Sequence, residues 1–126
     1  MQIHESGEDY LETILMLKQR LGVVRSIDIV REMNFSKPSV SIAMKRFREN
    51  GYIQVDSEGY ITLTEKGKQI AQRIYERHMV IAAVLMALGV DEATAYQDAC
   101  RMEHDLSEKS YQCIKEHYLT KQNNPK

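Results

Sequence analysis

The chain has 126 residues, of which 43% are apolar and 28% are charged. These proportions are ordinary for a globular protein and exclude a largely disordered chain. The longest apolar stretch, residues 80–90, is about half of the roughly 20 residues that span a bilayer, which excludes a membrane-spanning helix. The start of the sequence lacks the features of an export signal, and the two cysteines do not indicate a disulfide scaffold. We therefore expect a cytoplasmic protein with no membrane partner.

The charges are distributed unevenly along the chain. The net charge is −1, which by itself argues against a strongly basic nucleic-acid binder. However, residues 36–48 contain four cations and no anion, whereas the stretch from Asp91 onward contains seven acidic and five basic residues. This pattern indicates two separate tasks on one chain.

The first third of the chain predicts three helices in a helix-turn-helix order. Apolar residues recur at helical spacing over residues 8–21. A shorter helix follows with Ser26 as its N-cap, and a turn at residues 34–35 comes next. A third helix then runs from its cap, Ser36, to about Asn50.

A β-hairpin is predicted directly after the third helix. Residues 52–64 alternate β-branched or aromatic residues with polar ones around a turn at residues 57–59. Two strands alone are marginal in water, so the hairpin must pack on the preceding helices. This order of elements is that of a winged helix-turn-helix domain, which we expect at residues 1–64.

The remainder of the chain predicts an all-α domain at residues 65–126, so the fold class is mainly α. The expected helices cover residues 65–88, 92–105 and 108–118. Their expected N-caps are Thr64, Asp91 and Ser107.

The third helix is expected to present a basic, hydroxyl-rich face that suits the major groove of double-stranded DNA. Val40, Met44 and Phe47 fall on one side of a helical wheel, whereas Ile42 and Arg46 fall opposite. Cationic side chains would contact phosphates or guanine, and Ile42 a thymine methyl group. A merely solvated face is the alternative, but the adjacent hairpin favours DNA binding. The expected DNA contacts are Arg25, Ser36, Lys37, Pro38, Ser39, Ser41, Ile42, Lys45 and Arg46.

Two sets of residues in the second half indicate a metal site. Cys100, Glu103 and His104 are spaced i, i+3 and i+4, which places a thiolate, a carboxylate and an imidazole on one side of a helix. His78 interrupts the apolar stripe of the long helix. The alternatives are a packed cysteine and a hydrogen-bonded core histidine.

A third set lies near the start of the first helix. Asp9 and Glu12 are spaced i and i+3 among apolar neighbours. Acidic residues that complement the helix dipole are the alternative interpretation. Convergence of all three sets would make a divalent-metal site.

These residues resemble the DtxR/MntR family of metal-dependent bacterial transcriptional repressors. The resemblance extends from Asp9 to Leu106 and is carried by EDYLETI, SKPSVS, LTEKGK, ERH and DACRMEHDLS. It implies a winged-helix DNA-binding domain, a helical dimerisation and metal-binding domain, and operator binding activated by Fe²⁺ or Mn²⁺, with Zn²⁺, Co²⁺ or Ni²⁺ as substitutes. The ligands that it implies are Asp9, Glu12, His78, Cys100, Glu103 and His104.

The sequence combines features of two branches of that family. Asp9 and Glu12 match the manganese-type branch, as does the lack of a third, SH3-like domain in this sequence. Cys100 matches the iron-type branch, whose ancillary metal site is incomplete here because Ala82 and Tyr96 replace a carboxylate and a histidine. A thiolate favours Fe²⁺ over Mn²⁺, whereas the carboxylates favour harder ions, so we lean towards Fe²⁺.

The expected function is that of a metal-dependent regulator, a repressor of metal-uptake genes rather than an enzyme, with no organic substrate. Metal binding would couple the first helix to the second domain and set the spacing of the recognition helices in a homodimer. The expected dimer contacts are Ile81, Val84, Leu85 and Leu88, for which an intramolecular core is the alternative.

Two other functions compete with this interpretation. One is a metal-independent, redox-sensing winged-helix regulator that uses Cys100. The other is a small metallohydrolase, which the sequence disfavours because it has no Gly-rich phosphate loop, no G-x-S-x-G and no H-E-x-x-H.

Overall fold

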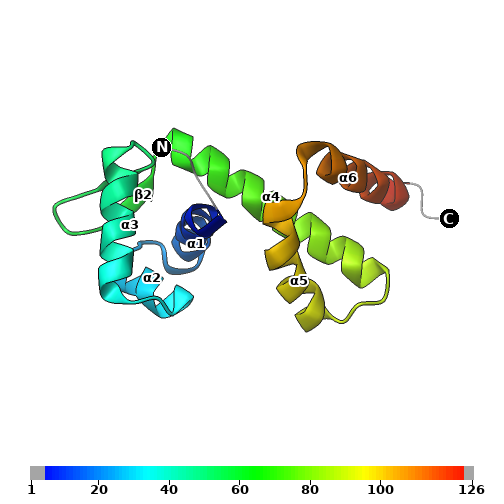
Figure 1. Ribbon diagram of the computed structural model, residues 1–126, viewed down its shortest axis with the longest axis horizontal. Coiled ribbons are helices and arrows are strands. Elements are labelled where there is room, and N and C mark those ends of the chain that lie inside the picture. Colours follow the sequence, from blue (N-terminus) through cyan, green and yellow to red (C-terminus); the bar gives the residue numbers. More distant parts are fainter. Residues whose placement is uncertain (1–4, 124–126) are drawn as a thin grey trace. The chain divides into compact units, whose positions relative to one another are not determined.

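A computed structural model describes residues 5–123 of the chain, and their elements are mainly helical (Figure 1). The order of helices and strands confirms the predicted winged helix-turn-helix arrangement followed by further helices. In chain order the elements are α1 (Glu5–Leu21), α2 (Ser26–Met33), α3 (Lys37–Glu49), β1 (Ile53–Val55), β2 (Ile61–Leu63), α4 (Glu65–Ala87), α5 (Glu92–Asp105) and α6 (Glu108–Asn123).

The chain divides into an N-terminal unit that ends at Arg73 and a C-terminal unit that starts at Ile74, so the boundary falls inside α4. In the N-terminal unit α1 packs against α2 and β2, while α3 packs against α2 and β1. The core of this unit is built from all of these elements and the first turns of α4. Its most deeply buried side chains include Leu11, Ile14, Leu17, Val24, Ile29, Val40, Ile53 and Ile61.

The hairpin, or wing, is an antiparallel pair in which Gln54 lies opposite Thr62. Ile53 and Ile61 are buried while Gln54 and Thr62 are exposed, which confirms the predicted alternation. The backbone N–H of Ile61 also donates to the carbonyl of Val24 at 2.7 Å. The wing is therefore attached to the segment between α1 and α2, as two marginal strands require.

The start of α4 is fixed against the wing by two residues. Thr64 Oγ1 accepts a hydrogen bond from the N–H of Gly67 at 3.2 Å and donates to the carbonyl of Gly51 at 2.7 Å, which confirms Thr64 as the N-cap. A Cβ atom at Gly67 would lie 2.1 Å from the carbonyl oxygen of Tyr52. Only glycine fits at this close approach of helix and wing.

The C-terminal unit consists of the rest of α4 with α5 and α6. Ile81 and Ala82 of α4 pack against Ala99 of α5 to form a small apolar core. Asp91 and Ser107 cap α5 and α6 by accepting hydrogen bonds from the N–H groups three residues later, as predicted. No helix in the described part of the chain is long and apolar enough to cross a bilayer.

Two predicted helix ends are wrong. α2 begins at Ser26 with Arg25 as its N-cap, because the Asp28 side chain accepts the N–H of Arg25 at 2.9 Å. α6 extends to Asn123 rather than to about Tyr118. The residues after Leu119 are polar, but they include good helix formers such as lysine and glutamine, so polarity alone does not end the helix.

Candidate functional site

The basic, hydroxyl-rich face of α3 has the predicted orientation. Val40, Met44 and Phe47 are buried in the core of the N-terminal unit. Ile42 is 61% exposed, and Arg46 is also exposed on the outer face. The apolar side chain that would contact a thymine methyl group is therefore held away from the core, where a ligand can reach it.

The start of α3 offers two hydroxyl groups and the positive end of a helix dipole to an anion. Ser36 caps the helix by accepting the N–H of Ser39 at 3.3 Å, and the two hydroxyl groups lie 2.8 Å apart. Pro38 stands in the first turn, where its missing N–H costs no helical hydrogen bond. Such a terminus favours phosphate through the helix dipole and the two hydroxyl groups.

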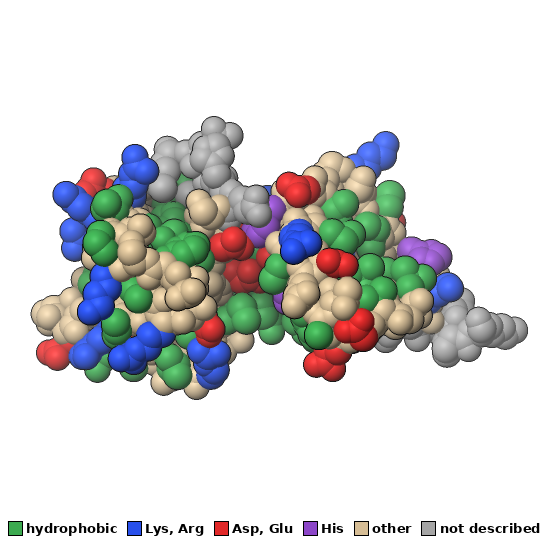
Figure 2. All heavy atoms as spheres, turned by 60° about the horizontal axis from the view of Figure 1, so that its bottom comes forward, with side chains coloured by type: hydrophobic (Ala, Val, Ile, Leu, Met, Phe, Trp, Pro, Cys, Tyr) green, Lys and Arg blue, Asp and Glu red, His purple; other side chains and the backbone are tan. Residues whose placement is uncertain are grey.

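Cationic side chains gather over the surface of the N-terminal unit, which lies at the left of Figure 2. Within it, Lys37, Lys45 and Arg46 are exposed on α3. Arg25 lies with its guanidinium carbon 4.4 Å from the ring centre of Tyr60, a cation–π contact that connects the N-cap of α2 to the wing. The sequence reasoning did not name Tyr60, although an aromatic residue beside a hairpin turn was a signal for such a support.

Three potential metal ligands from two helices meet in the C-terminal unit. His78 lies on α4, and Cys100 and Glu103 lie on α5. His78 Nδ1 is 2.9 Å from Glu103 Oε2 and 3.8 Å from Cys100 Sγ. One ligand atom from each residue lies within 4.8 Å of the other two. The structure therefore brings together three of the six predicted ligands as a nitrogen, sulfur and oxygen set, and a fourth, His104, lies 3.3 Å from Glu103.

Glu103 is the most deeply buried member of this cluster. Its side chain is fully buried. The carboxylate oxygen Oε1 lies 3.3 Å from Nε2 of His104 but forms no hydrogen bond of good geometry with any described residue. A buried carboxylate is costly unless a charge or hydrogen bonds compensate it. Its surroundings therefore fit a divalent cation, and borderline-soft transition metals accept this mixed donor set.

His78 compensates the buried carboxylate in the metal-free chain. Hydrogen bonds to Cys100 and Glu103 raise the pKa of His78 to about 10, against the lowering effect of burial. The imidazole is thus protonated at neutral pH and forms an ion pair with Glu103. Its ring also stacks on Tyr96 with 5.4 Å between the ring centres. A metal ion that uses this nitrogen must displace a proton.

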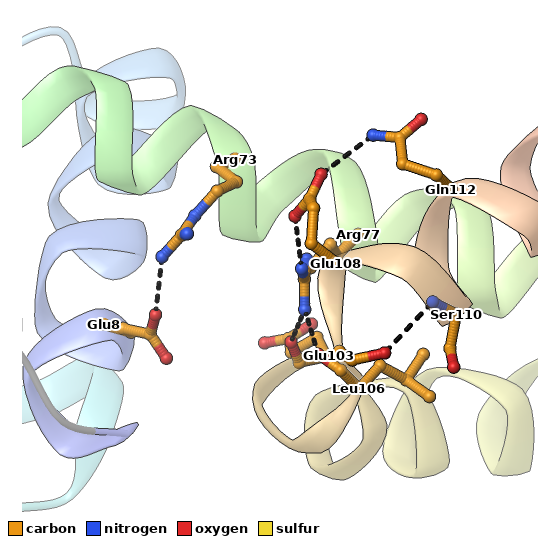
Figure 3. Close-up of polar contacts among 9 residues, drawn as sticks. Glu8, Arg73, Arg77, Glu103, Leu106, Glu108, Ser110 and Gln112 are labelled. Carbon is orange, nitrogen blue, oxygen red and sulfur yellow. Dashed lines mark hydrogen bonds and ion pairs between the residues drawn. The ribbon is translucent and has the colours of Figure 1, made fainter.

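Arg77 supports the cluster from α4, and the sequence reasoning did not name it. The guanidinium is buried and donates from Nη1 to the main-chain carbonyls of Glu103 and Leu106 at 3.1 and 2.8 Å. From Nη2 it donates to Glu108 Oε2 at 2.7 Å (Figure 3). The only sequence signal for this role is that Arg77 directly precedes the expected ligand His78 on the long helix.

The other predicted residues lie as follows. Asp9 and Glu12 are on α1 of the N-terminal unit, where Glu12 is buried and Asp9 is half-buried. Among the expected dimer contacts, Ile81 and Leu85 belong to the core between α4 and α5, whereas Leu88 is 77% exposed.

Two protein-family models match the chain one after the other. The model described as the N-terminal DNA binding domain of iron dependent repressors matches residues 2–61. The model described as their metal binding and dimerisation domain matches residues 64–126. Together the two matches span almost the whole chain.

Several curated proteins are similar over most of the chain. An uncharacterised HTH-type transcriptional regulator of Methanocaldococcus jannaschii is 34% identical over 113 residues, which cover 88% of this chain and 90% of that protein. The HTH-type transcriptional regulator MntR of Lysinibacillus sphaericus is 31% identical over 120 residues, 95% of this chain and 86% of its own length. The transcriptional regulator MntR of Escherichia coli is 34% identical over 103 residues, 82% of this chain and 66% of its own length.

Solved structures share the fold. The manganese regulator SloR matches with a TM-score of 0.77 at 26% identity, over 94% of this chain and 54% of SloR. IdeR of T. acidophilum matches with the same TM-score at 24% identity, over 88% of this chain and 53% of IdeR. The chain therefore spans about half the length of these two proteins.

Proposed function

Because this chain belongs to the DtxR/MntR family of metal-dependent DNA-binding transcriptional repressors, we propose that it binds operator DNA as a homodimer when Fe²⁺ or Mn²⁺ is bound. The genes that it represses would be those of metal uptake. The observation that carries the proposal is the convergence of His78, Cys100 and Glu103 around the fully buried Glu103 carboxylate.

The residues of the cluster define what a metal ion must satisfy. A bound divalent ion would supply the positive charge that balances the Glu103 carboxylate and the Cys100 thiolate. Without it, the protonated His78 balances the Glu103 carboxylate through a 2.9 Å contact. His104, whose side chain is almost fully buried beside the second Glu103 oxygen, is the fourth ligand in this proposal. The thiolate favours Fe²⁺ over Mn²⁺.

Asp9 and Glu12 complete the proposed ligand set. This part of the proposal depends on the family resemblance and on their i, i+3 spacing on α1, which directs both carboxylates to one side of that helix. Ligands on α1 would couple metal binding to the orientation of α3, because α1 and α3 share the core of the N-terminal unit. A coupling of about 1–3 kcal/mol is typical of such regulation.

An anaerobic DNA-binding titration tests the proposed function. Fluorescence anisotropy of a duplex selected from a random-sequence pool is measured with EDTA, Mn²⁺, Fe²⁺ or Zn²⁺. We expect the wild type to gain about 5–150-fold in affinity with Fe²⁺ or Mn²⁺. Cys100→Glu should shift the preference towards Mn²⁺, because a carboxylate is a harder ligand than a thiolate. Cys113→Glu is the matched control, since it introduces the same change at an exposed cysteine of α6.

Two results would contradict the proposal. A wild type that gains no affinity for any selected duplex with any of the three metals would overturn metal sensing. DNA binding that is indifferent to EDTA but lost with peroxide would instead favour the redox regulator, since Cys100 is exposed and lies 3.8 Å from an imidazole nitrogen.

A further inference from the structure

Arg77 is a charged residue that is buried in the protein. It lies on α4 and is only 5% exposed. Desolvation of a charged side chain is costly, so its partners must compensate. Figure 3 shows the guanidinium extending from α4 to the end of α5 and the start of α6.

The partners of Arg77 are the groups that a helix end leaves free. The carbonyls of Glu103 and Leu106, at the end of α5, accept its Nη1 hydrogens at 3.1 and 2.8 Å. Glu108, in the first turn of α6, accepts from Nη2 at 2.7 Å. A cation is favourable at a helix C-terminus, and bonds from a guanidinium are strong and directional. Arg77 therefore fixes the junction of α5 and α6.

Two neighbouring residues of α4 thus contact the main chain and the side chain of Glu103. Arg77 binds its main-chain carbonyl, while His78 faces its carboxylate at 2.9 Å. A side chain that is anchored at its main chain has fewer orientations available to its carboxylate. The hydrogen bonds of Arg77 therefore do more than cap α5, because they also restrict the direction in which the Glu103 carboxylate points.

We propose that Arg77 is a positioning residue of the metal centre, which holds Glu103 in the orientation that a metal ion requires. The inference depends on the proposed metal-binding function. Residues that orient ligands without contacting the metal contribute about 10–100-fold to metal affinity when measured by mutation. Such a residue also affects the geometry of the bound metal, which a residue that merely stabilises the fold does not.

The test uses Co²⁺ as the probe, bound to the full chain under anaerobic conditions. Arg77→Met removes the hydrogen bonds, Arg77→Lys keeps the charge without the planar group, and Glu108→Gln weakens one partner only. Arg101→Met is the matched control, because it removes an exposed arginine of α5 next to Cys100. The absorption bands of Co²⁺ report ligand geometry, titration gives the affinity, and circular dichroism gives the melting temperature.

We expect Arg77→Met to weaken Co²⁺ binding by about 10–100-fold and to alter the Co²⁺ ligand-field bands at a temperature where the variant is folded. Arg77→Lys should restore part of the affinity, whereas Arg101→Met should resemble the wild type. Should Arg77→Met not fold, Arg77→Lys and Glu108→Gln decide the question by the same two readouts.

A lower melting temperature with unchanged Co²⁺ bands and affinity in the folded Arg77 variants would overturn the positioning role and leave only a structural one. A wild type that binds no Co²⁺ would instead refute the proposed function itself. The two failures are therefore distinguishable.

Discussion

The motif Cys-x-x-Glu-His occurs twice in this chain, at residues 100–104 on α5 and at residues 113–117 on α6. The two copies have the same residue types at the same helical spacing. On α5 the glutamate is fully buried and faces His78 of α4. On α6, Cys113, Glu116 and His117 are all exposed.

The difference between the copies comes from what covers each helix. α6 contacts α4 through Tyr111, which stacks under Arg77, and through Lys115, which pairs with Glu76. Its cysteine, glutamate and histidine lie between and beyond these positions, and in the described part of the chain they form no group of converging ligand atoms. Helical spacing places three ligands on one side of a helix. They form a site only where the glutamate is buried and a further ligand, here His78, comes from another helix.

The largest expected effect that tests this comparison is on metal affinity. Glu103→Gln and Glu116→Gln make the same change in the two copies. Glu103→Gln should weaken Mn²⁺ and Co²⁺ binding by more than the roughly 10–100-fold that outer partners contribute, because it removes a charged ligand. Glu116→Gln should leave both affinities unchanged in isothermal titration. Equal losses in the two variants would contradict the distinction between buried and exposed copies.

Thiol accessibility offers the next test. Both cysteines are free and exposed in the metal-free chain, so an alkylating reagent should modify both. At a metal concentration of about 100 times the dissociation constant, alkylation of Cys100 should slow about 100-fold, since the reactive thiol belongs to the metal-free fraction. Peptide mass spectrometry over time separates the two sites. Protection of Cys113 to the same extent would place metal on α6 as well.

The pH dependence of metal binding is a smaller effect. The pKa of His78 is raised to about 10, so its imidazole carries a proton at neutral pH that a metal ion must displace. Metal affinity should therefore rise steeply with pH between pH 6.5 and 7.5, because His78 releases one proton and a cysteine binds metal as a thiolate, so that Cys100 releases another. Titrations in buffers of different ionisation enthalpy count these protons. His117→Gln should release as many protons as the wild type, and a His78→Gln variant that does not release about one proton fewer would contradict the role of His78.

The same group affects the metal-free fold more weakly. Because the folded pKa of His78 is raised, its pairing with Glu103 stabilises the protein fully below about pH 6.5, and this contribution is lost as pH rises through about 10. Thermal unfolding of the metal-free chain should show this decline in the wild type, with less of it in His78→Gln. Identical curves for both proteins would contradict the ion pair.

The smallest expected effect is on the stability contributed by the exposed copy. Glu116→Ala removes a solvated side chain and should change the free energy of unfolding by no more than about 0.5 kcal/mol. Urea denaturation measures this change. A loss of several times that size would mean that the α6 copy has partners in solution.

Much of the fold was predictable because its signals are local. Ser36, Thr64, Asp91 and Ser107 cap their helices through hydrogen bonds that span three residues, and such bonds depend on the adjacent sequence alone. The stripe of ligands on α5 was predictable for the same reason, since helical geometry fixes which residues share a side.

The sequence shows Arg77 next to the expected ligand His78, but the role of Arg77 was not predictable from it. An arginine in a long helix normally indicates a solvated position. Its role depends on the end of α5 lying against α4. The accepting carbonyl of Glu103 is 26 residues after Arg77 in the sequence. The preference for one copy of the motif over the other has the same origin, because only tertiary packing covers α5 and leaves the motif on α6 exposed.

The most direct test of the central claim compares metal-activated DNA binding in Glu103→Gln and Glu116→Gln under anaerobic conditions. Affinity for one selected duplex is measured with EDTA and with saturating Mn²⁺ for the wild type. The two variants are measured at the same metal concentration. If the cluster of His78, Cys100 and Glu103 controls DNA binding, Glu116→Gln keeps the full metal-dependent gain and Glu103→Gln loses it. A Glu103→Gln protein that gains as much affinity as the wild type would contradict the account.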